Sequence, residues 1–260
     1  MLHHEISGNG KKPLVLLHGF MENTTIWDEM EAHLSKDFTL IKIDLPGHGK
    51  SKVYQEIHTV ELMAEKVKEV IDALKLEKIN LLGHSLGGYV SLAFAEKFPE
   101  ILESMTLFFS TTVADDDEKK QIRRRSIAVI DENFETFVKT SIPNLFSNNE
   151  KDILEGKIEL AKNIAKSTDK EGVKAAQLGM AERPDRTEIL ENLDAKILII
   201  AGKYDNAVKT ENLLKIIPEK TNIKTYVLDC GHNGHWEKPT ICAEIINTEL
   251  LHNLPKHFLL

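Results

Sequence analysis

The sequence predicts an α/β fold: a doubly wound, mostly parallel sheet with a helical cap inserted between two of its strands. Three observations predict it. Short apolar runs alternate with amphipathic helical patterns through the first half of the chain. This alternation stops between about residues 111 and 193, where only helical patterns occur. It then resumes with two further apolar runs and a last helical pattern.

Six apolar runs are expected to form the strands of this sheet. They are short and continuous rather than alternating, which indicates strands that are buried on both faces, as in a parallel sheet. In chain order the runs are Leu14–Leu17, Phe38–Ile43, Ile79–Leu82, Thr106–Phe109, Ile197–Ile200 and Thr225–Leu228.

Amphipathic patterns between these runs predict the helices. In Thr59–Leu76, apolar residues such as Leu62, Val67 and Ile71 recur at helical spacing, with Lys and Glu opposite them. Leu86–Phe98 and Thr240–Leu251 have the same pattern. Helices that alternate with parallel strands cover both faces of a sheet, which is the arrangement of a doubly wound fold.

The long helical segment predicts how the chain is divided. A helical insertion between two strands of such a sheet is expected to lie over the carboxyl edge, where α/β proteins bind their ligands. We therefore expect a core of residues 1–110 and 194–260 and a helical cap, or lid, of residues 111–193. The charged stretch 115–125 (DDDEKKQIRRR) near its start is interpreted as a solvated helix face.

Composition and charge exclude several classes of partner. Charged residues make up 28% and hydrophobic residues 42%, as in ordinary globular proteins, and the net charge is −8 at pH 7. This acidic balance argues against nucleic acid and anionic membranes, because both attract a basic surface. No apolar run reaches the roughly 18 residues of a membrane span, and the N-terminus lacks the apolar segment of a signal peptide.

The cysteine content is typical of a reducing compartment. The two cysteines, Cys230 and Cys242, are too few for a disulfide framework. Together with the absence of a signal peptide, this leads us to expect a cytoplasmic protein.

The motif that carries chemistry is Gly83–Gly87 (GHSLG), which fits G-x-S-x-G between a predicted strand and a predicted helix. In this context a sharp turn raises the hydroxyl of Ser85 above the sheet, and the glycines allow the close approach of neighbouring backbone. The helix N-terminus favours negative charge, and the N–H of Leu86 is expected to stabilise an oxyanion. We therefore predict Ser85 as a nucleophile.

A serine hydroxyl needs an adjacent base, and that base needs a carboxylate to orient it. Of the 11 histidines, His232 and His235 follow a late strand in a loop, so both are candidates for the base. Asp205 follows the strand that ends at Gly202 and is within reach of a base on the neighbouring strand's loop.

Several motifs together make the chain resemble the α/β-hydrolase fold superfamily over nearly its whole length. They are His18-Gly19-Phe20 with Trp27, Asp44–Ser51 (DLPGHGKS), Gly83–Gly88 (GHSLGG), Gly202–Asp205 (GKYD) and Gly231-His232 with the following His-Trp-Glu-Lys-Pro. The resemblance implies a triad in the order Ser85, Asp205, His232, and an oxyanion hole made by the backbone N–H groups of Phe20 and Leu86. His235 stays an alternative for the base, and Asp115–Asp117 stays an alternative for the acid.

The predicted activity is that of a serine esterase, which cleaves carboxylic esters through an acyl-enzyme intermediate. The resemblance is greatest to small bacterial-type carboxylesterases, including the pimeloyl-carrier-protein methyl ester esterase group. It implies small or medium acyl esters as substrates and an apolar pocket, for which the candidate residues are Phe20, Met21, Leu145, Phe146 and Trp236.

No metal or cofactor is implied. No cluster has the spacing of metal ligands apart from the pair His232 and His235, and no glycine-rich phosphate loop occurs. The expected partner is a small-molecule ester, with neither nucleic acid nor a membrane.

Other activities use the same triad, and the residues around Ser85 are compatible with each. Within enzymes these are carbon–carbon bond hydrolases, cofactor-free perhydrolases (haloperoxidases) and a lyase of menaquinone synthesis. Outside enzymes, some relatives are ligand-binding receptors that retain the triad. The natural substrate depends on the inner face of the cap rather than on the motifs.

Overall fold

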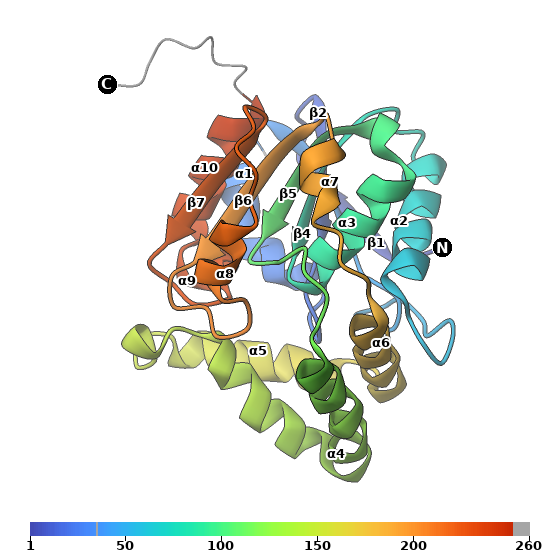
Figure 1. Ribbon diagram of the computed structural model, residues 1–260, viewed down its shortest axis with the longest axis vertical. Helices are drawn as coiled ribbons and strands as arrows, with labels where there is room; N and C mark the ends of the chain where they lie inside the picture. The colour runs from blue at the N-terminus through green and yellow to red at the C-terminus, as the bar shows by residue number, and fades with distance from the viewer. Residues whose placement is uncertain (35, 252–260) are drawn as a thin grey trace.

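The strands of the computed structural model, which describes residues 1–34 and 36–251, form one sheet (Figure 1). In this part of the chain the strands are β1 (His4–Ser7), β2 (Lys12–Leu17), β3 (Phe38–Ile43), β4 (Ile79–His84), β5 (Leu102–Phe108), β6 (Lys196–Gly202) and β7 (Ile223–Leu228). Their order is β1-β3-β2-β4-β5-β6-β7. Only β1 is antiparallel to its neighbour, so the predicted doubly wound, mostly parallel sheet is confirmed.

The predicted strands differ from the observed ones mainly at the edge of the sheet. Each of the six apolar runs overlaps one of β2 to β7, and β3 has the predicted bounds. The fourth run extends one residue too far, because Phe109 leaves the strand with φ 50°. Strand β1 was not predicted, because its four residues (HEIS) are half-buried at the edge of the sheet and form no apolar run.

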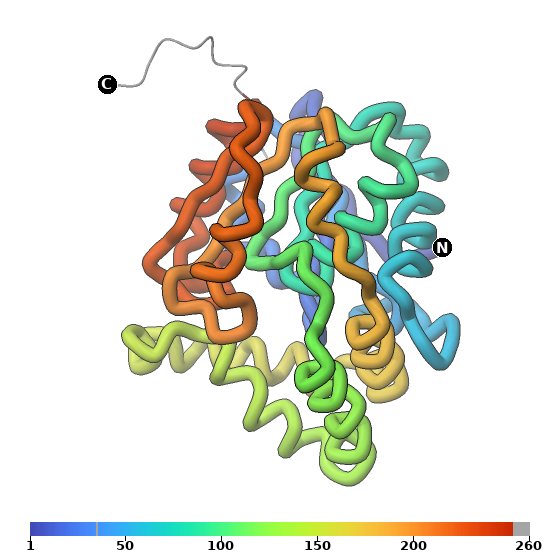
Figure 2. The backbone as a smooth tube through the Cα atoms, viewed as in Figure 1, coloured from blue at the N-terminus to red at the C-terminus, as the bar shows by residue number. Residues whose placement is uncertain are grey.

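Helices cover both faces of the sheet (Figure 2). Along β2, Val15 and Leu17 pack into one buried cluster, whereas Leu14 and Leu16 pack into another, as expected for alternating side chains. The first cluster includes helices α2 (Val60–Ala73), α3 (Leu86–Lys97), α7 (Glu188–Asn192) and α8 (Thr210–Lys215). The second includes α1 (Asp28–Leu34), α9 (Gly234–Glu237) and α10 (Pro239–Leu251).

Helix α2 illustrates how the sequence builds one of these faces. The hydroxyl of Thr59 accepts the N–H of Leu62 and so caps the helix at its N-terminus. Met63, Val67 and Ile71 are fully buried against the sheet. Burying an aliphatic side chain of this size contributes about 1.5–3 kcal/mol, which is why the amphipathic pattern locates the helix well.

Residues 111–193 contain helices and no strand among the described residues. They are α4 (Asp117–Ser141), α5 (Glu155–Ser167), α6 (Lys170–Glu182) and α7, with the short 3₁₀ helices η3 (Ile142–Leu145) and η4 (Asn148–Glu150). Figure 1 shows α4, α5 and α6 grouped below the sheet, at the end toward which the arrows of β5 and β6 point. The last helix, α7, instead packs against α3 with the core. Residues 252–260 of the predicted core lie outside the described residues.

Helix α4 is interrupted near its middle. Asn133 has φ −153° and ψ 84°, which are not helical values. Its side-chain oxygen accepts the N–H of Thr136 and thereby caps the second half of the helix. The interruption divides α4 into two straight parts, which are visible in Figure 1.

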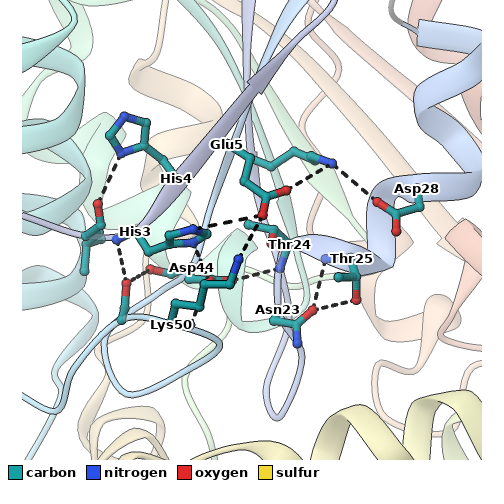
Figure 3. Close-up of polar contacts among 12 residues, drawn as sticks. His3, His4, Glu5, Asn23, Thr24, Thr25, Asp28, Asp44 and Lys50 are labelled. Atoms are coloured by element: carbon teal, nitrogen blue, oxygen red, sulfur yellow. Dashed lines mark hydrogen bonds and ion pairs between the residues drawn. The ribbon is translucent and has the colours of Figure 1, made fainter.

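A network of polar contacts fixes the chain where β3 ends (Figure 3). The carboxylate of Asp44 accepts the backbone N–H of Thr24 at 2.9 Å and that of Lys50 at 2.9 Å, and lies 2.8 Å from the ring Nδ1 of His3. These contacts join the segment before β1 to two loops at the carboxyl edge of the sheet. Asp44 therefore has a structural role, because it holds these three segments together.

Two further features concern the described part of the chain. No helix within residues 1–34 and 36–251 is both long and apolar enough to cross a membrane. Cys230 and Cys242 are buried free thiols.

Candidate active site

Ser85 lies in a strained turn between β4 and α3. Its φ of 48° and ψ of −108° are values that cost a residue with a side chain about 1–3 kcal/mol. The turn is held in place because the N–H of Ser85 donates to the carbonyl of Phe108 on β5. A Cβ at Gly83 would collide with the carbonyl oxygen of Gly87, which explains why the turn needs glycine there.

The structure brings Ser85, His232 and Asp205 together. The Nε2 atom of His232 lies 2.8 Å from the Oγ of Ser85, and its Nδ1 lies 2.7 Å from Oδ2 of Asp205. The three residues follow β4, β7 and β6, whose carboxyl ends meet at one edge of the parallel sheet. His232 and Asp205 are 2% and 5% exposed, so the contact between them is shielded from water.

The hydrogen bonds of Asp205 determine which nitrogen of His232 carries a proton. Its Oδ1 accepts the N–H groups of Ala207 at 2.7 Å and Val208 at 2.9 Å, which leaves Oδ2 for the imidazole. Because a carboxylate only accepts, Nδ1 of His232 is the donor. In the neutral ring Nε2 is then free to accept the proton of Ser85, which is the arrangement of a general base.

Burial and charge act in opposite directions on His232. Burial lowers its pKa, but the Asp205 carboxylate, through its charge and its hydrogen bond, raises it by more. The charge of Glu22 also raises the pKa, and the ammonium of Lys119 lowers it. The net result is a pKa above the ordinary value of 6.5.

This shift predicts the acid limb of the pH profile. A protonated His232 cannot accept the proton of Ser85, so kcat/KM should fall as the pH drops through the raised pKa of His232. We expect the midpoint of that limb to lie above pH 6.5. The measurement is kcat/KM for a soluble ester across the stability range of the protein, and a midpoint below this value would contradict the geometry.

The alternative base and acid do not lie against Ser85. His235 is fully buried, and neither of its ring nitrogens has a hydrogen-bond partner among the described residues. The carboxylate of Asp115 is held by Arg123 Nε at 2.5 Å and Arg183 Nη2 at 2.9 Å. Burial raises the pKa of Asp115, but the two guanidinium groups lower it to about 2. The next residues, 116 and 117, begin helix α4.

The predicted oxyanion donors are the backbone N–H groups of Phe20 and Leu86. Leu86 is the first residue of α3, so its N–H has no partner within the helix. Phe20 lies in the wall of the cavity that contains Ser85, and Met21 beyond it has φ 57°, which turns the loop. The assignment of these two N–H groups to an oxyanion hole stays a prediction.

A cavity of about 540 Å³ opens above Ser85 and His232. The loop after β2 contributes Phe20, Met21 and Glu22 to its wall. The helical segment contributes much of the apolar wall, with residues such as Ile122, Phe137, Leu145 and Met180. The chemistry therefore belongs to the sheet edge, and the shape of the cavity belongs largely to α4, η3 and α6.

Three of the five predicted pocket residues line this cavity, and two do not. Phe20, Met21 and Leu145 are in the wall. The rings of Phe146 and Trp236 instead stack on each other, with centroids 6.0 Å apart and planes 7° apart, in the core between η3 and α9. The prediction for these two residues is corrected accordingly, because their apolar surface is used in packing.

The charged stretch 115–125 is only partly a solvated helix face. Residues 116–118, 121, 122, 124 and 125 are exposed, but Asp115 is buried and paired with Arg123. Lys119 and Arg123 also line the cavity. The sequence-based interpretation was wrong for these three residues, because the buried partner Arg183 comes from α6's far end, more than 60 positions along the chain.

A structural role for Phe146 predicts a loss of stability without a change in selectivity. Replacing Phe146 with alanine removes a buried ring and should cost about 3–5 kcal/mol of unfolding free energy, measured by chemical denaturation. The acyl-chain preference of the variant should match the wild type, whereas Leu145→Ala should shift it toward longer chains. A shifted acyl-chain preference in Phe146→Ala would contradict this structural role and indicate that Phe146 lines the cavity.

The backbone of His232 is attached to the helical segment. Its N–H donates to the carbonyl of Leu145 at 2.8 Å. The buried carboxylate of Glu237 accepts the N–H groups of Gly231 at 2.8 Å and Ser147 at 3.2 Å, and so ties the same two loops together. The loop of the candidate base and the segment around η3 therefore form one packed unit.

Sequence reasoning missed a buried polar group beside the site. Glu22 and His84 form an ion pair, with Oε2 2.8 Å from Nδ1, and His235 lies next to them. The three side chains place possible metal-ligand atoms within 4.8 Å of one another. However, Oε2 of Glu22 already accepts from Gly19 and His84. No local sequence pattern predicts this cluster of side chains, since Glu22 and His84 are 62 positions apart.

Comparisons with known proteins agree with this architecture. A thermophilic esterase from Thermogutta terrifontis, solved with malate bound, is 33% identical with a TM-score of 0.89, over 96% of this chain and 93% of that one. A 2-hydroxy-6-oxononadienedioate/2-hydroxy-6-oxononatrienedioate hydrolase of Escherichia coli is 27% identical over 91% of this chain and 86% of its own. An uncharacterized protein of Mycobacterium tuberculosis is 35% identical over 102 residues, which cover 39% of this chain and only 30% of that relative.

The family assignment rests on most of the chain. Residues 12–239 match the family described as "alpha/beta hydrolase fold". This range runs from the start of β2 to the start of α10 and includes the elbow and both loops that meet it. The chain therefore belongs to the α/β-hydrolase fold family.

Proposed function

We propose that the protein is a serine hydrolase that cleaves carboxylic esters. The observation that carries the proposal is the continuous contact from Asp205 through His232 to Ser85, at 2.7 and 2.8 Å. Ser85 and His232 lie in the wall of a largely apolar cavity. A strained serine, a correctly oriented imidazole and a buried carboxylate are the parts that acyl transfer requires. The esterase activity named for the Thermogutta terrifontis relative supports the same choice.

In this mechanism Ser85 Oγ attacks the carbonyl carbon of the ester while its proton passes to Nε2 of His232. Asp205 stabilises the resulting imidazolium, and the N–H groups of Phe20 and Leu86 stabilise the oxyanion. His232 then returns the proton to the leaving alkoxide, and the alcohol departs. A water molecule, deprotonated by His232, attacks the acyl-enzyme and releases the carboxylic acid with Ser85 restored.

The cavity supports small and medium acyl esters as the substrate class. Its volume of about 540 Å³ lies within the usual range for small-molecule sites. Ile122, Phe137 and Met180 give it an apolar wall suited to an alkyl chain. In this proposal α4 to α6 act as the cap that selects the acyl chain.

The test combines an active-site probe with a substrate series. A fluorophosphonate probe should label the folded protein, and p-nitrophenyl esters should be hydrolysed fastest with acyl chains of short to medium length. Folded protein that neither reacts with the probe nor hydrolyses any ester would sink the proposal. Probe labelling without hydrolysis would favour a ligand-binding protein that retains the triad.

A carbon–carbon bond hydrolase is the second candidate. It is favoured by the basic side chains Lys119 and Arg123 in the cavity wall, which would attract the carboxylate of an acidic diketone. The wall also holds the carboxylates of Glu22, Asp116 and Glu118, which would act against it. The name of the Escherichia coli relative also favours this candidate. Measuring kcat/KM for a vinylogous diketo acid beside p-nitrophenyl butyrate distinguishes the two, and peroxide-dependent halogenation tests the perhydrolase alternative.

A further inference from the structure

We propose that Glu22 is a positioning residue, which holds the oxyanion loop and the loop of His232 in register with Ser85 by way of His84. The inference rests on the proposed hydrolase function and adds a second, buried support to the site. Glu22 lies in the loop after β2, and His84 is the last residue of β4.

The contacts join two loops through the last residue of β4. Oε2 of Glu22 accepts the backbone N–H of Gly19 at 2.5 Å and the ring Nδ1–H of His84 at 2.8 Å. On the other side of the ring, Nε2 of His84 donates to the carbonyl of His232 at 3.0 Å. Each end of this chain of contacts is therefore an atom of the backbone that carries a predicted part of the site.

The hydrogen-bond acceptors around His84 determine its charge. Its two ring nitrogens face a backbone carbonyl, which cannot donate a proton, and the carboxylate of Glu22, which cannot donate while it is ionised. Both nitrogens must therefore carry hydrogen, so His84 is an imidazolium paired with the carboxylate of Glu22. The side chains are 1% and 9% exposed, which means that the pair is shielded from solvent.

The environment keeps Glu22 ionised. Burial raises its pKa, but the charge and the hydrogen bond of His84 lower it to about 2. His235 has a pKa well below its ordinary value because it is buried and lies beside His84. It is therefore neutral, which leaves His84 as the single cation of this group among the described residues.

The position of the network allows it to control how the oxyanion donor, the nucleophile and the base are aligned. Gly19 directly precedes Phe20, the predicted oxyanion donor, and His84 directly precedes Ser85. Releasing the network would let the donor, the nucleophile and the base shift relative to one another, and a misplacement of about 1 Å can cost on the order of 100-fold in rate. Substrate binding depends mainly on the cap and should change little.

The network also acts on His232 through charge. The charged and titratable groups that face His232 are Asp205, Glu22, Lys119 and the rings of His84 and His235. Glu22 raises the pKa of His232. Glu22→Gln removes this negative charge, but the proton that His84 loses with it removes a positive charge whose ring lies 5.1 Å from that of His232. The two changes oppose each other, so the acid limb of kcat/KM should stay close to that of the wild type.

The test is Glu22→Gln, which keeps the shape and removes the charge. We expect kcat to fall by about 10- to 100-fold with KM within about threefold of wild type. Glu31→Gln is the matched control, because it removes one charge from the ion pair with Lys42, 2.6 Å away on β3. The control should keep the wild-type kcat and acid limb.

A readout independent of activity is the protonation of His84. In ¹⁵N-histidine NMR the wild type should show His84 with both nitrogens protonated at neutral pH, and Glu22→Gln should lose this signature. His84→Gln should reproduce the loss in kcat, and the double variant should be no slower than the slower single, because both act through one path. This variant also serves if Glu22→Gln folds poorly.

The outcomes separate the two hypotheses. Wild-type protein that neither labels with a fluorophosphonate nor hydrolyses esters would overturn the proposed function, while the NMR signature would still decide whether the ion pair exists. An active wild type with an unchanged kcat in Glu22→Gln would overturn the positioning role. Losses that multiply in the double variant would overturn it as well.

Discussion

Replacing Ser85 with alanine is expected to lower kcat by about 10⁴- to 10⁶-fold. The substitution removes the atom that attacks the carbonyl and leaves the imidazole of His232 without its proton donor at 2.8 Å. The strained turn should persist, because alanine has the same Cβ as serine and the N–H of residue 85 still donates to Phe108. The measurement is steady-state hydrolysis of a p-nitrophenyl ester together with labelling by a fluorophosphonate.

The matched control for this experiment is Ser91→Ala, on the same helix. Its hydroxyl donates to the carbonyl of Gly87 and is fully buried. The control should label and turn over as the wild type does. Labelling that persists in Ser85→Ala would show that another residue is the nucleophile.

Replacing Asp205 with asparagine should lower kcat/KM by about 10³- to 10⁴-fold. Oδ1 of residue 205 must remain an oxygen, because it accepts two backbone N–H groups. The amide nitrogen would then face Nδ1 of His232 and force the imidazole proton onto Nε2, where it cannot act as a base toward Ser85.

The same substitution should also move the acid limb to lower pH, because the carboxylate is the largest group that raises the pKa of His232. Asp229→Asn is the control, since its carboxylate is exposed and pairs with Lys203 at 3.1 Å on the surface. An Asp205→Asn variant that keeps a tenth or more of the wild-type kcat/KM would contradict the role assigned to Asp205.

The elements that the sequence predicts well are those whose burial is visible in a local pattern. Strand β3 shows a run that is almost entirely buried, and its bounds are those predicted. Strand β1 is short, half-buried and at the edge, and its pairing with β3 depends on residues more than 30 positions away. Such pairing leaves no local signal.

The same contrast between local sequence patterns and long-range packing applies to the candidate site. The elbow around Ser85 is a contiguous motif, so its position between β4 and α3 was predictable. The choice between His232 and His235 depends on which ring faces Asp205, and the loop sequence does not contain that information. The pair of Glu22 and His84, and the burial of Phe146 against Trp236, likewise arise only when distant segments pack together.

Helix α4 has a mechanical consequence for the cavity that it covers. Before its start, Asp115 is tied to a buried Arg183, and just after its end the ring of Phe146 is stacked on Trp236. The helix is thus held at both ends, and neither end can move without breaking buried contacts. Bending should concentrate at Asn133, where the ladder of helical hydrogen bonds is already interrupted. A substrate too large for the cavity would therefore be accommodated by bending of α4 at Asn133, and the carboxyl edge of the sheet that carries Ser85 would keep its position.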